Sequence, residues 1–148
     1  MVDYKEMMTK YAPLKGGMIE AFHAVQNEIN YLPEEAIIAA AEAFGVPVKE
    51  AYGVATFYSF FSTKTRGKYI IRICESAPCH IAGAEEVIQA LEKELGISMG
   101  ETTPDGKFTL EFTECIGQCQ KTPVISINSK PYEGMTPEKI SQVLAEYK

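Results

Sequence analysis

The chain has 148 residues, of which 46% are apolar and 23% are charged, values that fit a folded globular protein and exclude a disordered chain. Twenty acidic residues outnumber fourteen basic ones, for a formal net charge of −6. This balance argues against binding to nucleic acid or to an anionic membrane surface, because both reward clustered Lys and Arg.

The chain contains no segment with the pattern of a targeting signal or a membrane helix. Residues 1–6 lack the basic region and apolar core of a secretory signal, and they are too acidic and Arg-poor for a transit peptide. Apolar runs such as residues 36–41 fall far short of the ~18 residues that a membrane helix requires. We therefore expect a bacterial cytoplasmic protein without direct membrane insertion, which reaches a membrane only through partners.

The N-terminal part has the apolar spacing of helices. A first helix is predicted where apolar residues recur every three or four positions, at Met18, Phe22, Val25 and Ile29. Pro33 and two glutamates favour the start of a second helix over residues 34–44, with Gly45 as its cap. Pro47 opens a short helix through residues 49–51, and an aromatic segment follows.

The polar stretch 62–68 breaks this pattern, and the apolar periodicity changes beyond it. The pattern predicts a strand over residues 69–73 ending at Cys74, a helix from near Ile81 to Gly96, and strands over residues 107–113 and 124–127. Tyr132 is expected to begin a short fourth strand, and Thr136-Pro137 to start a last helix. Both helices must cover the small sheet, since an isolated sheet of this size would leave an apolar face in water.

The four cysteines form two closely spaced pairs, Cys74 with Cys79 and Cys115 with Cys119. In each pair the first cysteine ends a predicted strand and the second lies in the loop that follows. Two such strand ends can bring both thiolate pairs to the same end of one sheet. That arrangement suits a binuclear iron site, with one pair for each iron and sulfides bridging them.

The expected surroundings also suit an anionic group. Two ferric ions, two sulfides and four thiolates sum to about −2, and reduction adds one more negative charge. A helix that begins near Ile81 would offer unpaired N–H groups and its positive dipole end. Gly117 can adopt a positive φ and turn backbone N–H groups toward sulfur.

Three other interpretations of the cysteines stay open at this point. Disulfides are disfavoured in a reducing compartment. A structural zinc site also takes four thiolates, but such sites usually use Cys-x-x-Cys, which neither pair has. The same missing motif weakens a thioredoxin-like thiol oxidoreductase. Histidine ligation is excluded by count and place, because only His23 and His80 are present and His80 adjoins Cys79.

The cysteine segments resemble those of the thioredoxin-like [2Fe–2S] small subunits of NADH-linked oxidoreductases: Cys74-Glu-Ser-Ala-Pro-Cys79-His80 with Gly83-Ala84, and Cys115-Ile-Gly-Gln-Cys119 with Pro123-Val124. That family includes the small iron–sulfur subunit of complex I and small subunits of NAD-dependent or electron-bifurcating hydrogenases and formate dehydrogenases. The resemblance covers nearly the whole chain, with further segments at Tyr31-Leu32-Pro33, Gly53-Val54-Ala55-Thr56-Phe57-Tyr58 and residues 132–139. Residues 120–122 depart from it, because relatives more often carry small apolar residues there.

The resemblance implies an α/β fold in two domains. These are an N-terminal helical bundle over residues 1–66 and a thioredoxin-like [2Fe–2S] domain over residues 67–148, with a small mixed sheet flanked by helices. One [2Fe–2S] cluster would be held by four cysteine ligands, Cys74, Cys79, Cys115 and Cys119. Thioredoxin-like folds often have a cis proline before a central strand, so a cis Thr122–Pro123 bond is expected.

The implied function is that of an accessory electron-transfer subunit of an NAD(H)-dependent oxidoreductase, not catalytic alone. The chain has no G-x-G-x-x-G fingerprint and no P-loop. FMN and NAD(H) are therefore expected on a partner, a flavin- and NAD-binding iron–sulfur subunit, beside further catalytic subunits of the complex. The parent complex is not distinguished, because complex I, hydrogenase and formate dehydrogenase differ on other chains.

Two further features allow both a structural and a functional interpretation. Glu75 and Glu114 adjoin ligand positions, and are either solvated loop charges or groups that lower the potential of a cluster. The aromatic segment over residues 52–61, with Tyr58 in it, is either core of the helical part or a docking surface for the flavin subunit.

Overall fold

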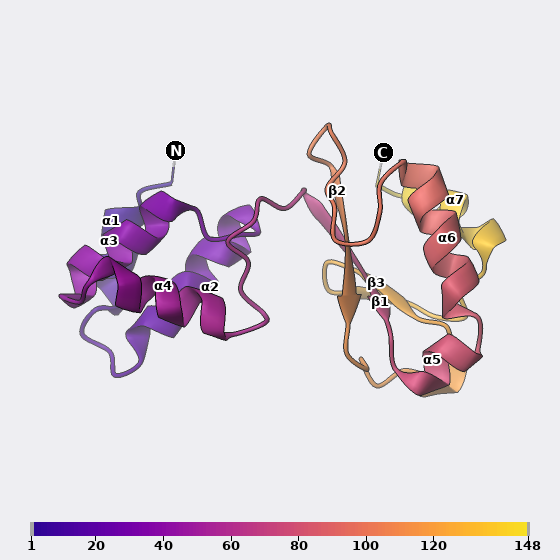
Figure 1. Cartoon of the computed structure of the whole chain (residues 1–148), viewed down its shortest axis with the longest axis horizontal. Helices are drawn as coiled ribbons and strands as arrows, with labels where there is room; N and C mark the ends of the chain where they lie inside the picture. Colours follow the sequence, from indigo (N-terminus) through magenta and orange to yellow (C-terminus); the bar gives the residue numbers. More distant parts are fainter. Residues whose placement is uncertain (1, 148) are drawn as a thin grey trace. The chain divides into compact units, whose positions relative to one another are not determined.

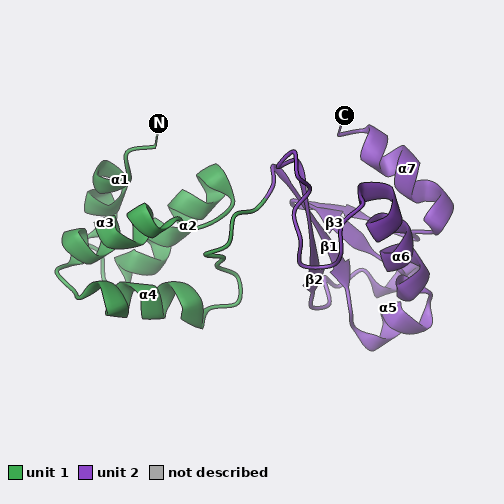
Figure 2. Ribbon diagram, turned by 45° about the horizontal axis from the view of Figure 1, so that its top comes forward, with its two compact units in different colours: residues 1–66 green, residues 67–148 purple. Residues whose placement is uncertain are grey.

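The computed structural model describes residues 2–147, which divide into two units with the boundary between Arg66 and Gly67 (Figure 2). The first unit is made of helices and the second of a four-stranded mixed sheet with helices (Figure 1). The predicted α/β class is confirmed.

The first unit has four helices, each starting soon after the previous one ends: α1 Tyr4–Tyr11, α2 Gly17–Ile29, α3 Glu34–Phe44 and α4 Val48–Phe57. The predicted helices over α2 and α3 are confirmed, and Gly45 caps α3 with a φ of 65°. The helix after Pro47 is longer than predicted and continues to Phe57. Ala51 and Ala55, one turn apart, bury the same face of α4, and this packing extends the helix into the aromatic segment.

The core of this unit combines large side chains with small ones. Phe22, Leu32 and Met8 are fully buried, and α3 contributes a face of alanines. Gly17 marks a place where only glycine fits, because a Cβ there would lie 2.1 Å from the backbone oxygen of Tyr11.

The sheet of the second unit has the strand order β2-β1-β3-β4. β1 Tyr69–Cys74 runs parallel to β2 Phe108–Thr113, while β3 Ile125–Ile127 and β4 Lys130–Tyr132 continue the sheet in antiparallel pairs. Tyr132 ends the fourth strand and does not begin it as predicted. It pairs with Ile125, which sets the register of this short edge strand.

Two helices, α6 Ala84–Leu95 and α7 Pro137–Ala145, lie on the same side of this sheet (Figure 1). The core between them and the sheet contains buried aliphatic side chains, among them Ile71, Ile73, Leu91, Leu110, Ile125 and Ile140. A further helix, α5 Ala77–Ile81, stands between β1 and α6. The predicted helix that ends at Gly96 is confirmed as α6, but its predicted start near Ile81 is wrong, since Ile81 ends α5 and α6 begins at Ala84.

Two further predictions concern the Thr122–Pro123 peptide bond and the presence of a membrane-spanning helix. The Thr122–Pro123 bond is cis, as expected. Among residues 2–147, no helix has both the length and the apolar character needed to cross a bilayer.

Candidate metal centre

The four cysteines occupy the ends of two neighbouring parallel strands and the segments that follow them. Cys74 is the last residue of β1 and pairs with Thr113, the last residue of β2. Cys79 lies within α5, not in a loop as predicted, and Cys119 opens the short 3-10 helix η1 Cys119–Lys121. Cys115 follows β2 closely. The parallel pairing brings both segments to the same end of the sheet.

The four thiols form two pairs, and the pairs interact electrostatically with each other. The Sγ atoms of Cys115 and Cys119 are 3.4 Å apart, and the Cys74 and Cys79 thiols are hydrogen-bonded to each other. The Cys119 thiol is also within electrostatic range of both Cys74 and Cys79. Over residues 2–147, no three or more His, Cys, Asp or Glu side chains gather as ligands of a single metal ion.

The two pairs differ in burial. Cys74 and Cys79 are 2% and 1% exposed and belong to the core of the unit, whereas Cys115 and Cys119 are exposed to solvent. One pair therefore faces the packed interior and the other faces the surface.

Backbone N–H groups from both loops point at the sulfurs. The amide of Gly117 donates to the Cys115 Sγ at 3.4 Å, and Gly117 has the positive φ expected of it, 81°. The Cys74 thiol is hydrogen-bonded to the backbone of Ser76 and Ile116, and the Cys79 thiol to that of Val124. Such concave groups of N–H donors stabilise a bound negative charge.

These contacts change the acidity of the thiols in opposite directions. Burial alone would raise the pKa of Cys74, but hydrogen bonds from Ser76, Cys79 and the backbone of Ile116 outweigh it and lower that pKa. Burial, followed by the contact with Cys74, raises the pKa of Cys79. The hydrogen bond with Cys115 raises the pKa of Cys119. A metal ion bound at Cys79 and Cys119 would displace the protons that these raised pKa values retain.

The loop at Gly117 turns an N–H group toward sulfur as predicted, but the other donors around the site differ from the prediction. The expected contribution of a helix start near Ile81 is wrong, because Ile81 ends the short helix α5 and its side chain is 84% exposed. The amides of Ile116 and Val124 were missed. Their only signals in the sequence are the neighbouring Gly117 and the cis proline at position 123.

The remaining candidate residues lie apart from the thiols or at their margin. His80 is exposed on α5, and His23 belongs to the first unit, where its ring stacks on Phe60 at 4.9 Å. Glu75 directly follows Cys74, and Glu114 directly precedes Cys115; both glutamates are exposed. The backbone amide of Glu75 donates to Thr113 at 3.1 Å and so ties the two strand ends together.

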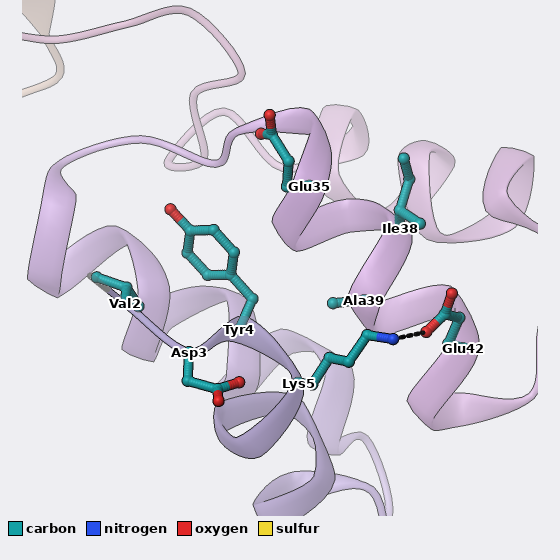
Figure 3. Close-up of a pocket in the computed structure, with 8 residues that line it drawn as sticks. All are labelled: Val2, Asp3, Tyr4, Lys5, Glu35, Ile38, Ala39 and Glu42. Carbon is teal, nitrogen blue, oxygen red and sulfur yellow. Dashed lines mark ion pairs between the residues drawn. The ribbon is translucent and has the colours of Figure 1, made fainter.

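A hollow of about 450 Å³ lies between α1 and α3 in the first unit (Figure 3). Its edge carries an ion pair between Lys5 and Glu42, with 3.0 Å between nitrogen and oxygen. Both side chains are mostly exposed, so this pair adds little to stability. None of the candidate ligands, and neither Glu75, Glu114 nor Tyr58, lines this hollow.

Comparison with known proteins identifies close relatives. The family model of the thioredoxin-like [2Fe–2S] ferredoxins matches residues 4–148. NADP-reducing hydrogenase subunit HndA of Solidesulfovibrio fructosivorans is 35% identical over 133 residues, which cover 90% of this chain and 78% of the relative. An NADH-quinone oxidoreductase subunit of Escherichia coli (strain K12) is 41% identical over 141 residues, which cover 95% of this chain and 85% of that relative.

The fold also resembles part of a solved structure. A chain of an NAD+-reducing [NiFe]-hydrogenase in the air-oxidized state superposes with a TM-score of 0.77 at 24% sequence identity. The match covers 88% of this chain but 22% of the hydrogenase chain. At this identity the likeness shows the fold alone.

Proposed function

Because the chain belongs to the thioredoxin-like [2Fe–2S] ferredoxin family, we propose that it is the [2Fe–2S] electron-transfer subunit of an NADH-linked flavin and iron–sulfur oxidoreductase. It acts as an accessory subunit and has no catalysis of its own. The observation that carries the proposal is the meeting of two cysteine pairs at one end of the sheet, with backbone N–H groups aimed at their sulfurs.

In this proposal Cys74, Cys79, Cys115 and Cys119 hold one cluster. When bound, a [2Fe–2S] cluster accepts or gives up one electron at a time. The amides of Gly117, Ile116 and Val124 offset the negative charge of the thiolates. The buried pair anchors the site in the core, and the exposed pair leaves it accessible to a partner.

The electrons are exchanged with a flavin- and NAD-binding subunit. A flavin converts a two-electron hydride transfer into single-electron steps, and a one-electron carrier beside it is needed to pass these on. The names of the relatives include both a quinone oxidoreductase subunit and a hydrogenase subunit. The proposal is therefore confined to the step that such complexes share, with FMN and NAD(H) on the partner.

The division into an N-terminal helical domain, residues 1–66, and a cluster-binding domain, residues 67–148, is part of the proposal. It is supported by the separate hydrophobic cores of the two units. The cytoplasmic location stays a prediction, with any membrane association through partner subunits.

The experiment that tests this function is anaerobic purification followed by visible absorption and electron paramagnetic resonance spectroscopy. The wild-type protein is expected to be red-brown and to hold two irons and two sulfides per chain. Each single Cys→Ser substitution at the four proposed ligands is expected to lose most of the visible band.

The matched control is His80→Ala, which removes an exposed potential ligand next to Cys79 and should leave the spectrum unchanged. A colourless protein with one zinc per chain would instead support a zinc-stapled interaction module. A colourless protein whose thiols exchange with disulfides would support a thiol oxidoreductase. Either result would overturn the proposal.

A further inference from the structure

The loop that carries Cys119 is held by a second segment of the unit, residues 133–135, between β4 and α7. The amide of Gly134 donates to the carbonyl of Lys121 at 2.7 Å, and the amide of Met135 donates to the carbonyl of Pro123 at 2.9 Å. These bonds connect two segments that lie more than ten residues apart in the sequence. Segment 133–135 therefore fixes the backbone immediately after the Cys119 position.

The holding segment is itself firmly placed. Met135 is 2% exposed and belongs to the core of the second unit. The Lys139 ammonium donates to the carbonyl of Gly134 at 2.6 Å. Gly134 has a φ of 56°, a conformation that glycine adopts without steric cost. The segment is a rigid support for the loop.

The same two segments are joined by a charge pair. The Lys121 Nζ lies 3.3 Å from the Glu133 Oε2, with the lysine side chain 69% exposed and the glutamate side chain only 29% exposed. Lys121 follows Cys119 by two residues within η1, and two residues of chain span at most about 7 Å between Cα atoms. The ion pair therefore stands on the loop that carries Cys119. A net charge on this pair would act on a group bound at Cys119, most strongly at low ionic strength.

We propose that Glu133 is a positioning residue that holds and neutralises Lys121, and that this ion pair sets the reduction potential of the cluster. The inference rests on the proposed function. Reduction makes the cluster more negative, so an unbalanced positive charge nearby favours the reduced form. Glu133 supplies the charge that opposes Lys121.

The test is a redox titration of the intact, cluster-loaded chain, followed by the visible band at low ionic strength. Glu133→Gln is expected to raise the midpoint potential, because Lys121 stays charged and unbalanced. Lys121→Met is expected to lower it, because Glu133 stays charged. The double variant is expected to return close to the wild-type value, and all shifts should shrink as salt is added.

The matched control is Glu146→Gln. It makes the same charge change and breaks another ion pair of this unit, Lys130 with Glu146 at 2.8 Å. Lys130 pairs with Ile127, at the end of β3 away from Pro123, so this variant should leave the potential unchanged.

The outcomes separate this inference from the function on which it rests. A wild-type protein without the cluster band would overturn the proposed function. Two results with a normal cluster band would overturn only the inference. In the first, neither Glu133→Gln nor Lys121→Met shifts the midpoint potential. In the second, Glu146→Gln shifts it as much as Glu133→Gln does. Glu133→Gln could fail to retain the cluster. In that case the test uses Lys121→Met, which changes an exposed side chain. A lowered midpoint potential in Lys121→Met supports the inference, and an unchanged one overturns it.

Discussion

Charged residues beside the proposed cluster ligands are expected to influence the reduction potential of a bound cluster. Glu75 and Glu114 are exposed directly beside Cys74 and Cys115. Water and salt screen such charges, so their influence depends on ionic strength. Glu133 differs from them, because its charge is partly buried and paired with Lys121.

Replacing Glu75 by Gln is expected to raise the midpoint potential of the cluster, since one negative charge beside the ligand Cys74 is lost. The shift should be largest at about 0.01 M salt and should vanish near about 1 M, where the Debye length falls from about 30 Å to about 3 Å. A redox titration at both salt concentrations measures it. Glu94→Gln, an exposed position near the end of α6, is the control. An unchanged potential in Glu75→Gln would leave Glu75 as a solvated surface charge.

At the level of elements, the aromatic segment over residues 52–61 contains both buried and exposed rings. Phe61 is 7% exposed and packs in the core, with its ring centroid 5.7 Å from that of Phe22. Tyr58 is half-buried and stacks on Phe60 at 5.1 Å. Phe57, at the end of α4, is 79% exposed. The core interpretation therefore fits Phe61, and the docking interpretation is best tested at Phe57.

Phe61→Ala is expected to reduce the free energy of unfolding of the first unit by about 3–5 kcal/mol, the usual cost of removing a buried phenylalanine. The matched change Phe57→Ala should stay within about 0.5 kcal/mol, because it removes an exposed ring. Urea unfolding followed by circular dichroism measures both.

Equal losses of stability in the two variants would contradict this division. Copurification with the flavin subunit gives the second measurement. Weaker assembly of Phe57→Ala at unchanged stability would support docking through this ring.

At the level of the whole molecule, the two units have separate cores, and all four cysteines belong to the second. A ligand that binds only the folded state stabilises the part of the protein that holds it. The consequences of losing the cluster should therefore be confined to residues 67–148.

Removal of the cluster by an iron chelator is expected to lower the unfolding temperature of residues 67–148 and to leave that of residues 1–66 unchanged. Hydrogen exchange resolved by peptide would assign each change to its unit. Residues 67–148 expressed alone should bind the cluster with the spectrum of the full chain. Faster exchange throughout both units after chelation would contradict the proposed domains.

Features that depend on neighbours along the chain could be predicted from the amino-acid sequence. The helices α2, α3 and α6 could be predicted because their apolar spacing and their Gly or Pro boundaries are local signals. The spacing of the cysteines and the motifs around them were enough to identify the family. The parallel strands β1 and β2 followed from short apolar runs that end beside cysteines.

Features that depend on contacts between distant segments became visible in the folded chain. The helix α5 has five residues, too few for a periodic signal, and so short a helix forms only where packing stabilises it. The amides that face the thiols come from Ile116 and Val124 because two loops meet there. The ion pair between Lys121 and Glu133 depends on the position of the segment that follows β4. Local propensity cannot encode these contacts, because each joins residues that only the folded chain brings together.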